Sequence, residues 1–261
     1  MISLSKPPKI IKKEGNLATF EIEALYPGYG VTVGNSLRRV LLSSLEGAAV
    51  TQMKIKGVPH EFSTIPGILE DVVTIMLNLK QMRFRLFTEE PQTATLKVKG
   101  EKEVKGSDFE FPAQVELVNK NCHIATLTDK KAELEMEIRI EKGIGYSPRE
   151  VREKEKLEIG MIPLDVIFTP VRRISYRIEN MRVGERTDFD RLFLDIETDG
   201  TITPEAAFFQ ASEILVNHFS LFATTFQEKA KELPPRPALV KKRVAKKAKK
   251  HAKKKKESKI K

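Results

Sequence analysis

The stretch TPEAAFFQASEILVNHFSLFATTFQEKAKE, residues 203–232, has the pattern of one long apolar helix. Thr203 suits the N-cap, Pro204 the first helical position and Glu205 the first turn, so a helix is predicted to start here. It runs to about Glu232, before Leu233-Pro234-Pro235. One side carries an apolar seam with near-heptad spacing, made of Ala207, Ala211, Ile214, Leu215, His218, Leu221, Phe222 and Phe226.

Four phenylalanines lie on an outer sector of the same helix, and the last of them also belongs to the seam: Phe208, Phe209, Phe219 and Phe226. A helix that is apolar nearly all round must be covered from more than one side. We expect its own domain to cover one side and another chain to cover the other. A single large core that encloses the whole helix is the alternative.

Composition narrows the class of protein. The 261 residues are 40% hydrophobic and 31% charged, enough for a core beneath a highly charged surface. No apolar run approaches the length of a membrane span, and the first 16 residues lack a secretory apolar region. The one cysteine cannot form an internal disulfide, which fits a reducing cytosol. A cytoplasmic location is therefore expected.

The net charge of +10 is concentrated in one segment. Residues 1–239 hold 33 basic and 35 acidic residues, whereas residues 240–261 hold 13 basic residues and one acid. We therefore expect any non-specific affinity for nucleic acid to reside in this tail. Its cations include Lys241, Lys242, Arg243, Lys246, Lys247, Lys249, Lys250, Lys253, Lys254, Lys255 and Lys256.

A second helix is predicted from Asn35, an N-cap candidate, to a stop at Gly47. Its apolar stripe is Leu37, Val40, Leu41, Ser44 and Leu45. Arg38 and Arg39 lie at the edge of this stripe, which favours partner carboxylates or carbonyls. Plain solvation of the two arginines is the alternative.

The remaining pattern predicts an α+β fold. Alternating apolar residues indicate a strand over 17–24, several strands between 82 and 141, and two more over 173–180 and 191–198. A helix is predicted over 68–80, and the glycine-rich then charged residues 143–160 are expected to be a surface loop. Beyond residue 233, a linker with prolines and the lysine-rich tail lack the apolar content to fold.

No catalytic set is evident. Gly28, Gly30 and Gly34 precede a helix, but their spacing fits neither phosphate-loop fingerprint, so turn glycines are favoured. Asp188-Phe189-Asp190 is a weak metal pattern, and a structural loop with Arg186 and Arg191 as local partners is preferred. The four histidines are scattered and Cys122-His123 has no second ligand pair, so no cofactor is expected on this chain.

Two long motifs resemble the bacterial RNA polymerase alpha subunit family. The first is YPGYGVTVGNSLRRVLLSSLEGAAVTQMKIKGVPHEFSTIPGILEDVVTIMLNLK at 26–80, and the second is RVGERTDFDRLFLDIETDGTITPEAAFFQASEILVNHF at 182–219. Shorter matches between them are CHIATLTD, KGIGYSP and FTPVRRISY. The resemblance covers about residues 8–232.

The resemblance implies an assembly platform without active-site residues. Members form a homodimer that recruits the large catalytic subunits beta and beta-prime, with Mg²⁺ expected on beta-prime. The interface helices correspond here to about 35–46 and 204–231. The implied domains are a dimerisation domain from 1–46 and 169–233, an inserted mainly antiparallel β domain from 47–168, and a linker and tail from 234–261.

The same resemblance implies site residues. The expected dimer contacts are Leu37, Val40, Leu41, Ser44, Leu45, Ala211, Ile214, Leu215, His218, Leu221 and Phe222. Arg39 matches a position implicated in binding beta, with Arg38 beside it, and Lys80 matches one implicated in contacts to the large subunits. The segment from Leu164 to Arg173, including Asp165 and Val171, matches one implicated in contacting beta-prime.

The C-terminal sequence departs from the family. Typical members carry a second, small helical domain that binds upstream DNA and activators, whereas this sequence has the lysine-rich run. We expect sequence-independent phosphate attraction in its place, and DNA contact otherwise through the assembled polymerase. Two other classes remain open: a monomeric RNA- or ribosome-binding protein that uses the tail, and an enzyme that binds a nucleotide at Gly28–Gly34.

Overall fold

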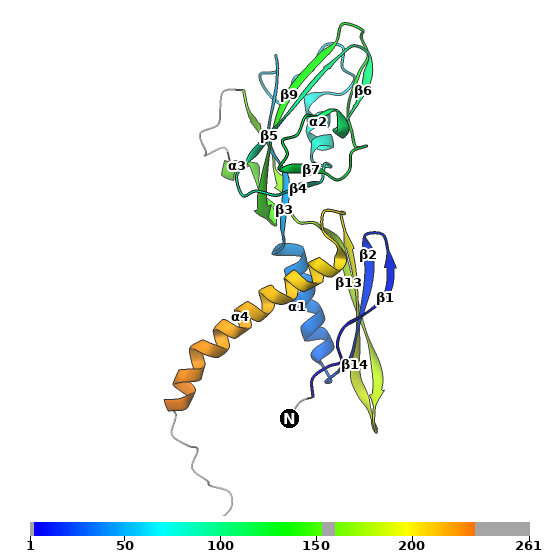
Figure 1. Cartoon of the computed structure of the whole chain (residues 1–261), viewed down its shortest axis with the longest axis vertical. Helices are drawn as coiled ribbons and strands as arrows, with labels where there is room; N and C mark the ends of the chain where they lie inside the picture. The colour runs from blue at the N-terminus through cyan, green and yellow to red at the C-terminus, as the bar shows by residue number, and fades with distance from the viewer. Residues whose placement is uncertain (1–2, 153–159, 233–261) are drawn as a thin grey trace, which may run out of the picture. The chain divides into compact units, whose positions relative to one another are not determined.

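The structure, a computed structural model, describes residues 3–152 and 160–232 (Figure 1). Residues up to Val216 form one compact unit, and the chain from Asn217 forms a second, of which the end of one helix is described. The described residues combine antiparallel sheets with helices, which confirms the predicted α+β class. None of the helices within this part of the chain has the length and apolar character needed to cross a membrane. The predicted tail, 234–261, lies outside the described residues.

One antiparallel sheet is built from both ends of the sequence (Figure 1). Its strand order is β1-β2-β14-β13, with bounds β1 Lys9–Glu14, β2 Leu17–Leu25, β14 Arg186–Thr198 and β13 Val171–Val183. Helices α1 (Tyr29–Ser43) and α4 (Pro204–Glu232) contribute to the core on one face of this sheet. The predicted inward residues of β2 are all buried, which confirms that strand: Ala18, Phe20, Ile22 and Ala24.

A second antiparallel sheet occupies the middle of the sequence. Its strand order is β5-β9-β3-β4-β7, and β11 also pairs with β3. The bounds are β3 Glu46–Ile55, β4 Phe84–Leu86, β5 Gln92–Lys99, β7 Val115–Leu117, β9 Glu133–Ile144 and β11 Ile162–Pro163. Around it lie α2 Val72–Leu79, β6 Lys102–Lys105, the 3₁₀ turn η1 Gly106–Asp108, β8 His123–Leu127, β10 Tyr146–Ser147, α3 Arg149–Arg152 and β12 Val166–Ile167.

The two sheets have separate apolar cores. The larger core draws its buried residues from between Ala49 and Phe168. The smaller draws on residues between Ala18 and Leu45 and between Val171 and Ala211. The cleanest predicted alternation, on β9, is confirmed because its inward residues are buried: Leu134, Met136, Ile138 and Ile140. The exact domain boundaries remain a prediction.

The start of α1 corrects the sequence analysis. The helix begins at Tyr29, so Asn35 lies inside it and is not the N-cap. The carboxylate of Asp190, on β14, accepts hydrogen bonds from the backbone N–H groups of Gly28 at 2.9 Å and Gly30 at 3.0 Å. A distant residue therefore caps the helix, and the β-branched residues at 31–33 lie inside it.

Other boundaries also differ from the prediction. Helix α2 begins at Val72 rather than residue 68, because Asp71 caps it by accepting from the Thr74 N–H at 2.8 Å. Residues 143–160 are not simply a loop, since β9 continues to Ile144 and β10 and α3 follow. Gly47 does not end a helix: α1 ends at Ser43, and Gly47 lies in β3.

Candidate functional site

The glycines around the start of α1 offer no open anion site. The Asp190 carboxylate already occupies the N–H groups of Gly28 and Gly30, and Asp190 is only 8% exposed. A helix N-terminus filled by a carboxylate has no room for a phosphate there. Gly34 serves packing instead, because an added Cβ would lie 2.9 Å from Leu192 Cδ1. The interpretation as structural glycines is therefore favoured over a nucleotide loop.

The acidic pair at 188–190 is structural. Arg186 binds Asp188 through two hydrogen bonds of 3.0 and 2.7 Å, as predicted. Arg191 instead approaches Glu21 at 3.5 Å and a second glutamate of β2. Across residues 3–152 and 160–232, no group of three His, Cys, Asp or Glu side chains is placed to hold a metal ion.

Helix α1 turns most of its predicted interface inward. Leu37 and Leu41 on α1, and Leu45 just after its end, are at most 4% exposed and belong to the core of their own chain, so they have almost no surface to offer a second copy. Val40 and Ser44 are half-buried. The exposed apolar residue near them is Leu42, which the interface prediction did not include.

Arg38 and Arg39 have different environments although they are adjacent. Arg39 is exposed, which leaves its guanidinium accessible to a partner. Arg38 is half-buried, and its Nε is a buried donor without a hydrogen-bond partner among the described residues. A buried unsatisfied donor is costly, but a partner could not reach it, so Arg39 is the more accessible of the two arginines.

Helix α4 changes character along its length. Ala207 and Ala211 are fully buried, and Phe208 stacks on Phe20 with ring centroids 4.8 Å apart. Ile214 and Leu215 are half-buried, and His218 is exposed. Large apolar side chains that are more than half exposed also lie on the helix: Phe209 at 66%, Val216 and Phe219 at 60%, Leu221 at 61% and Phe222 at 55%.

The structure brings two distant predicted residues together. Lys80, just after α2, forms an ion pair with Asp165, and this hydrogen bond lowers the pKa of the Asp165 carboxyl. Leu164 and Val171 are buried in the two cores and contribute little accessible surface. Arg173 remains exposed while it pairs with Glu197 at 3.2 Å. Of the predicted large-subunit set, Arg39 and Arg173 are thus exposed, and Arg38, Lys80 and Asp165 are half-buried.

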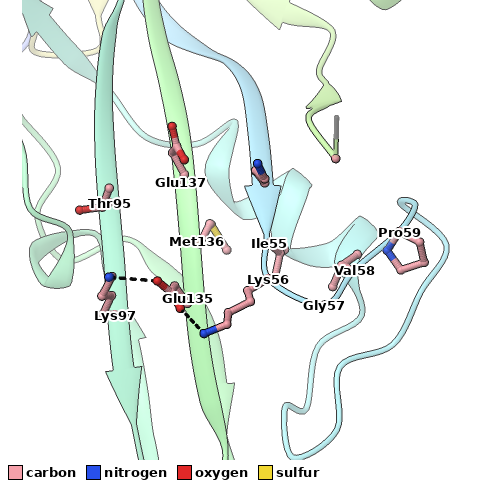
Figure 2. Close-up of a pocket in the computed structure, with 12 residues that line it drawn as sticks. Ile55, Lys56, Gly57, Val58, Pro59, Thr95, Lys97, Glu135, Met136 and Glu137 are labelled. Carbon is pink, nitrogen blue, oxygen red and sulfur yellow. Dashed lines mark hydrogen bonds and ion pairs between the residues drawn. The ribbon is translucent and has the colours of Figure 1, made fainter. Parts of the chain in front are cut away.

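A surface pocket on the second sheet was not predicted (Figure 2). Hydrogen bonds from Lys56 and Lys97 lower the pKa of Glu135 in its wall to about 2. Lys56 follows the end of β3 and Lys97 lies on β5, so their ion pairs with Glu135 connect both neighbouring strands to β9. The lining residues are Lys54, Ile55, Lys56, Gly57, Val58, Pro59, Thr95, Lys97, Glu135, Met136, Glu137 and Gly160.

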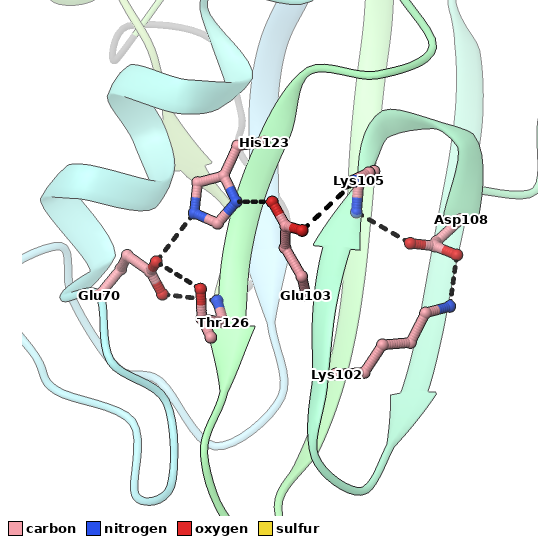
Figure 3. A network of polar contacts seen from close by, with 7 residues as sticks. All are labelled: Glu70, Lys102, Glu103, Lys105, Asp108, His123 and Thr126. Atoms are coloured by element: carbon pink, nitrogen blue, oxygen red, sulfur yellow. Dashed lines mark hydrogen bonds and ion pairs between the residues drawn. The ribbon is translucent and has the colours of Figure 1, made fainter.

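A polar network around His123 was also missed (Figure 3). The Glu70 carboxylate accepts from Thr126 N at 2.6 Å and Thr126 Oγ1 at 3.0 Å, and it lies 2.9 Å from His123 Nε2. Burial raises the pKa of Glu70, but these hydrogen bonds outweigh it and the pKa is lowered. The network attaches the segment before α2 to β8. Because its partners are far apart in sequence, no local pattern could have indicated it.

Comparison of the amino-acid sequence with known proteins identifies the family to which the chain belongs. Residues 53–169 match the family described as RNA polymerase Rpb3/RpoA insert domain. A Symbiobacterium thermophilum protein named DNA-directed RNA polymerase subunit alpha is 46% identical over 231 residues, which cover 87% of this chain and 73% of the relative. Proteins of the same name from Oceanobacillus iheyensis and Alkaliphilus oremlandii are 46% and 48% identical over 85% and 82% of this chain, and over 71% and 67% of their own lengths. The chain therefore belongs to the family of DNA-directed RNA polymerase alpha subunits.

Proposed function

We propose that this chain is a non-catalytic assembly subunit, in which two copies associate through α1 and α4 and then recruit the beta and beta-prime subunits. The observation that carries the proposal is the set of large apolar side chains on α4 that are 55–66% exposed. Large apolar side chains that are left this exposed mark surfaces that bind another protein chain. A two-fold contact between identical copies is the commonest way to cover it.

The contact is redefined by what is accessible. Leu42 on α1 and Phe209, Val216, Phe219, Leu221 and Phe222 on α4 replace the buried leucines of α1 as the main apolar contacts. Burying one large apolar side chain contributes roughly 1.5–3 kcal/mol, so partial burial of this set in both copies suffices to offset the entropy of association.

Recruitment of the large subunits rests on the charged, accessible residues. Arg39 supplies an exposed guanidinium, which suits bidentate recognition of a carboxylate. Lys80 and Asp165 present a preformed ion pair beside a buried Leu164. Charged side chains that are already held in place lose little conformational entropy when a partner binds them.

The test combines light scattering with co-purification. The full chain is expected to elute as a dimer, and the Arg39→Ala variant is expected to remain dimeric while it recovers much less beta subunit. Lys130→Ala, another exposed cation with no role in the proposal, is the matched control. A monomer at high micromolar concentration contradicts the dimer, and loss of self-association in Arg39→Ala moves that residue to the dimer contact.

A second role is proposed for residues 240–261, because they carry 13 basic residues and one acid. Such a segment attracts phosphate by releasing condensed counterions, without reading sequence. It would add non-specific nucleic-acid affinity to the assembled polymerase.

A further inference from the structure

The two edges of the four-stranded sheet differ in how they are protected. β1 is short, carries Lys9, Lys12 and Lys13, and has a bulge between Ile10 and Lys12. Short length, lysines and bulges are the features by which natural proteins discourage pairing at an edge strand. β1 is therefore an edge that resists an added strand.

The opposite edge, β13, lacks those features over its central part. It is 13 residues long, without lysine or proline, and its irregularities fall only near the two ends, between Val171 and Arg173 and between Met181 and Val183. From Arg173 to Met181 the ladder with β14 is continuous. In the part of the chain that the structure describes, no second strand pairs with β13. A regular stretch of this kind presents about 30 Å of free backbone donors and acceptors.

The side chains beside this edge are incompletely covered. Ile174, Tyr176 and Ile178 point toward the helix-covered face but are only half-buried. An added strand would shield them further, as neighbouring strands do within a sheet. Among the described residues, this edge thus has no neighbouring strand on its open side, and its apolar flank is incompletely covered.

Charge selects the occupant of the edge. β13 carries Arg172, Arg173, Arg177 and Arg182 against one acid, Glu179. The acids that pair with Arg173 and Arg177 on the neighbouring strand, Glu197 and Asp195, lie one strand farther from the free edge. A second copy of β13 would bring together two strands that each carry four arginines and one acid, which charge repulsion disfavours. Nucleic acid lacks the alternating donors and acceptors that a strand edge requires.

We infer that the free edge of β13 binds an extended, acidic segment of another protein chain by strand addition. Backbone hydrogen bonds hold the segment, and carboxylates next to the arginines select it. The inference deepens the proposed assembly role, because it describes how β13, which begins at Val171, binds a partner chain. The inference rests on the proposed assembly role only in taking the acidic segment to belong to another subunit of the assembly.

A peptide tests the edge directly. The probe is a twelve-residue acetylated peptide of alternating threonine and glutamate with a fluorescent label, titrated into the full chain at low salt. Two further peptides isolate the mechanism: threonine alternating with lysine, and the acidic peptide with N-methyl groups on four consecutive central residues, which removes donors from both of its edges. The acidic peptide is expected to bind at least tenfold more tightly than either.

Variants of the protein locate the site. Arg172→Glu with Arg173→Glu is expected to weaken binding of the acidic peptide at least tenfold. Lys9→Glu with Lys12→Glu applies the same charge change at the other edge and is expected to leave binding unchanged. Hydrogen exchange should show new protection at alternate amides between Arg173 and Met181 when the peptide is bound.

Each outcome bears on the inference. Equal binding of the methylated and unmodified acidic peptides would show attraction by side-chain charge alone and would overturn strand addition. Protection elsewhere, no binding, or equal effects of the two charge reversals would overturn it as well. Dimerisation and recruitment of beta are measured on the same wild-type sample, so failure of the peptide with intact assembly refutes this inference and leaves the proposed function standing.

Discussion

Phe168 lies against two glycines, and this contact gives a prediction that can be worked out in detail. Gly47 and Gly143 are register partners on β3 and β9. A Cβ added at Gly143 would lie 2.6–2.7 Å from three ring atoms of Phe168, whereas a Cβ at Gly47 would overlap the Phe168 carbonyl oxygen. One clash is therefore with a removable side chain and the other with the backbone.

The substitutions should behave differently for that reason. Gly143→Ala is expected to destabilise by about 1–3 kcal/mol, the usual cost of overpacking. Phe168 is 5% exposed, so Phe168→Ala should cost roughly 3–5 kcal/mol. In the Phe168→Ala background Gly143→Ala should cost about zero, because the ring that it meets is gone. Gly47→Ala should remain destabilising in both backgrounds.

Urea unfolding followed by circular dichroism measures these free energies as a double-mutant cycle. The expected coupling energy between Gly143→Ala and Phe168→Ala is about 1–3 kcal/mol, with none between Gly47→Ala and Phe168→Ala. If Gly143→Ala costs the same with and without the ring, the packing argument is wrong. Equal m-values across the set serve as the check that the unfolding transition is unchanged.

Three further outcomes are expected. Phe219→Ser with Phe222→Ser should raise the dimer Kd at least about a hundredfold by sedimentation equilibrium, since roughly 1.5–3 kcal/mol accompanies each buried side chain; an unchanged Kd would exclude them from the contact. The pKa of Glu135 lies near 2 instead of 4.5, so its ion pairs stabilise the fold above about pH 4.5 and are lost as the pH falls toward 2. The stability difference between wild type and Lys56→Gln should therefore shrink over that range in acid titrations, and a constant difference would argue against the pair. Deletion of residues 240–261 should flatten the salt dependence of DNA binding by the assembled polymerase; the same slope would show that the tail does not contact DNA.

Sequence patterns predicted well where the determinants are local. The helix start at Thr203-Pro204 is confirmed, and the Thr203 hydroxyl accepts from the Ala206 N–H at 3.2 Å. The alternation from Leu134 to Ile140 gave the correct face of β9. In both cases the residues that cap a helix or repeat along a strand are neighbours in the chain, so their spacing carries the information.

The residues of the proposed interface were only partly predictable from the sequence. An apolar stripe on a helix satisfies a core and a dimer contact equally well, so Leu37 and Leu41 on α1 could not be distinguished from Leu221 and Phe222 on α4. The structure assigns the first pair to the chain's own core and leaves the second pair exposed. Which sheet edge remains open is likewise a property of strand order, which no single strand encodes.

The amino-acid sequence alone determined the α+β class, the amphipathic helices and strands, and the segregation of basic residues into one segment, because these follow from side-chain type and spacing. Only the tertiary structure decided three contacts. Asp190 caps the start of α1, Lys80 forms an ion pair with Asp165, and the Phe168 ring packs against Gly143. Each of these contacts joins residues that lie far apart along the chain. Their proximity depends on how the sheets pair and pack, and not on any property of the local sequence.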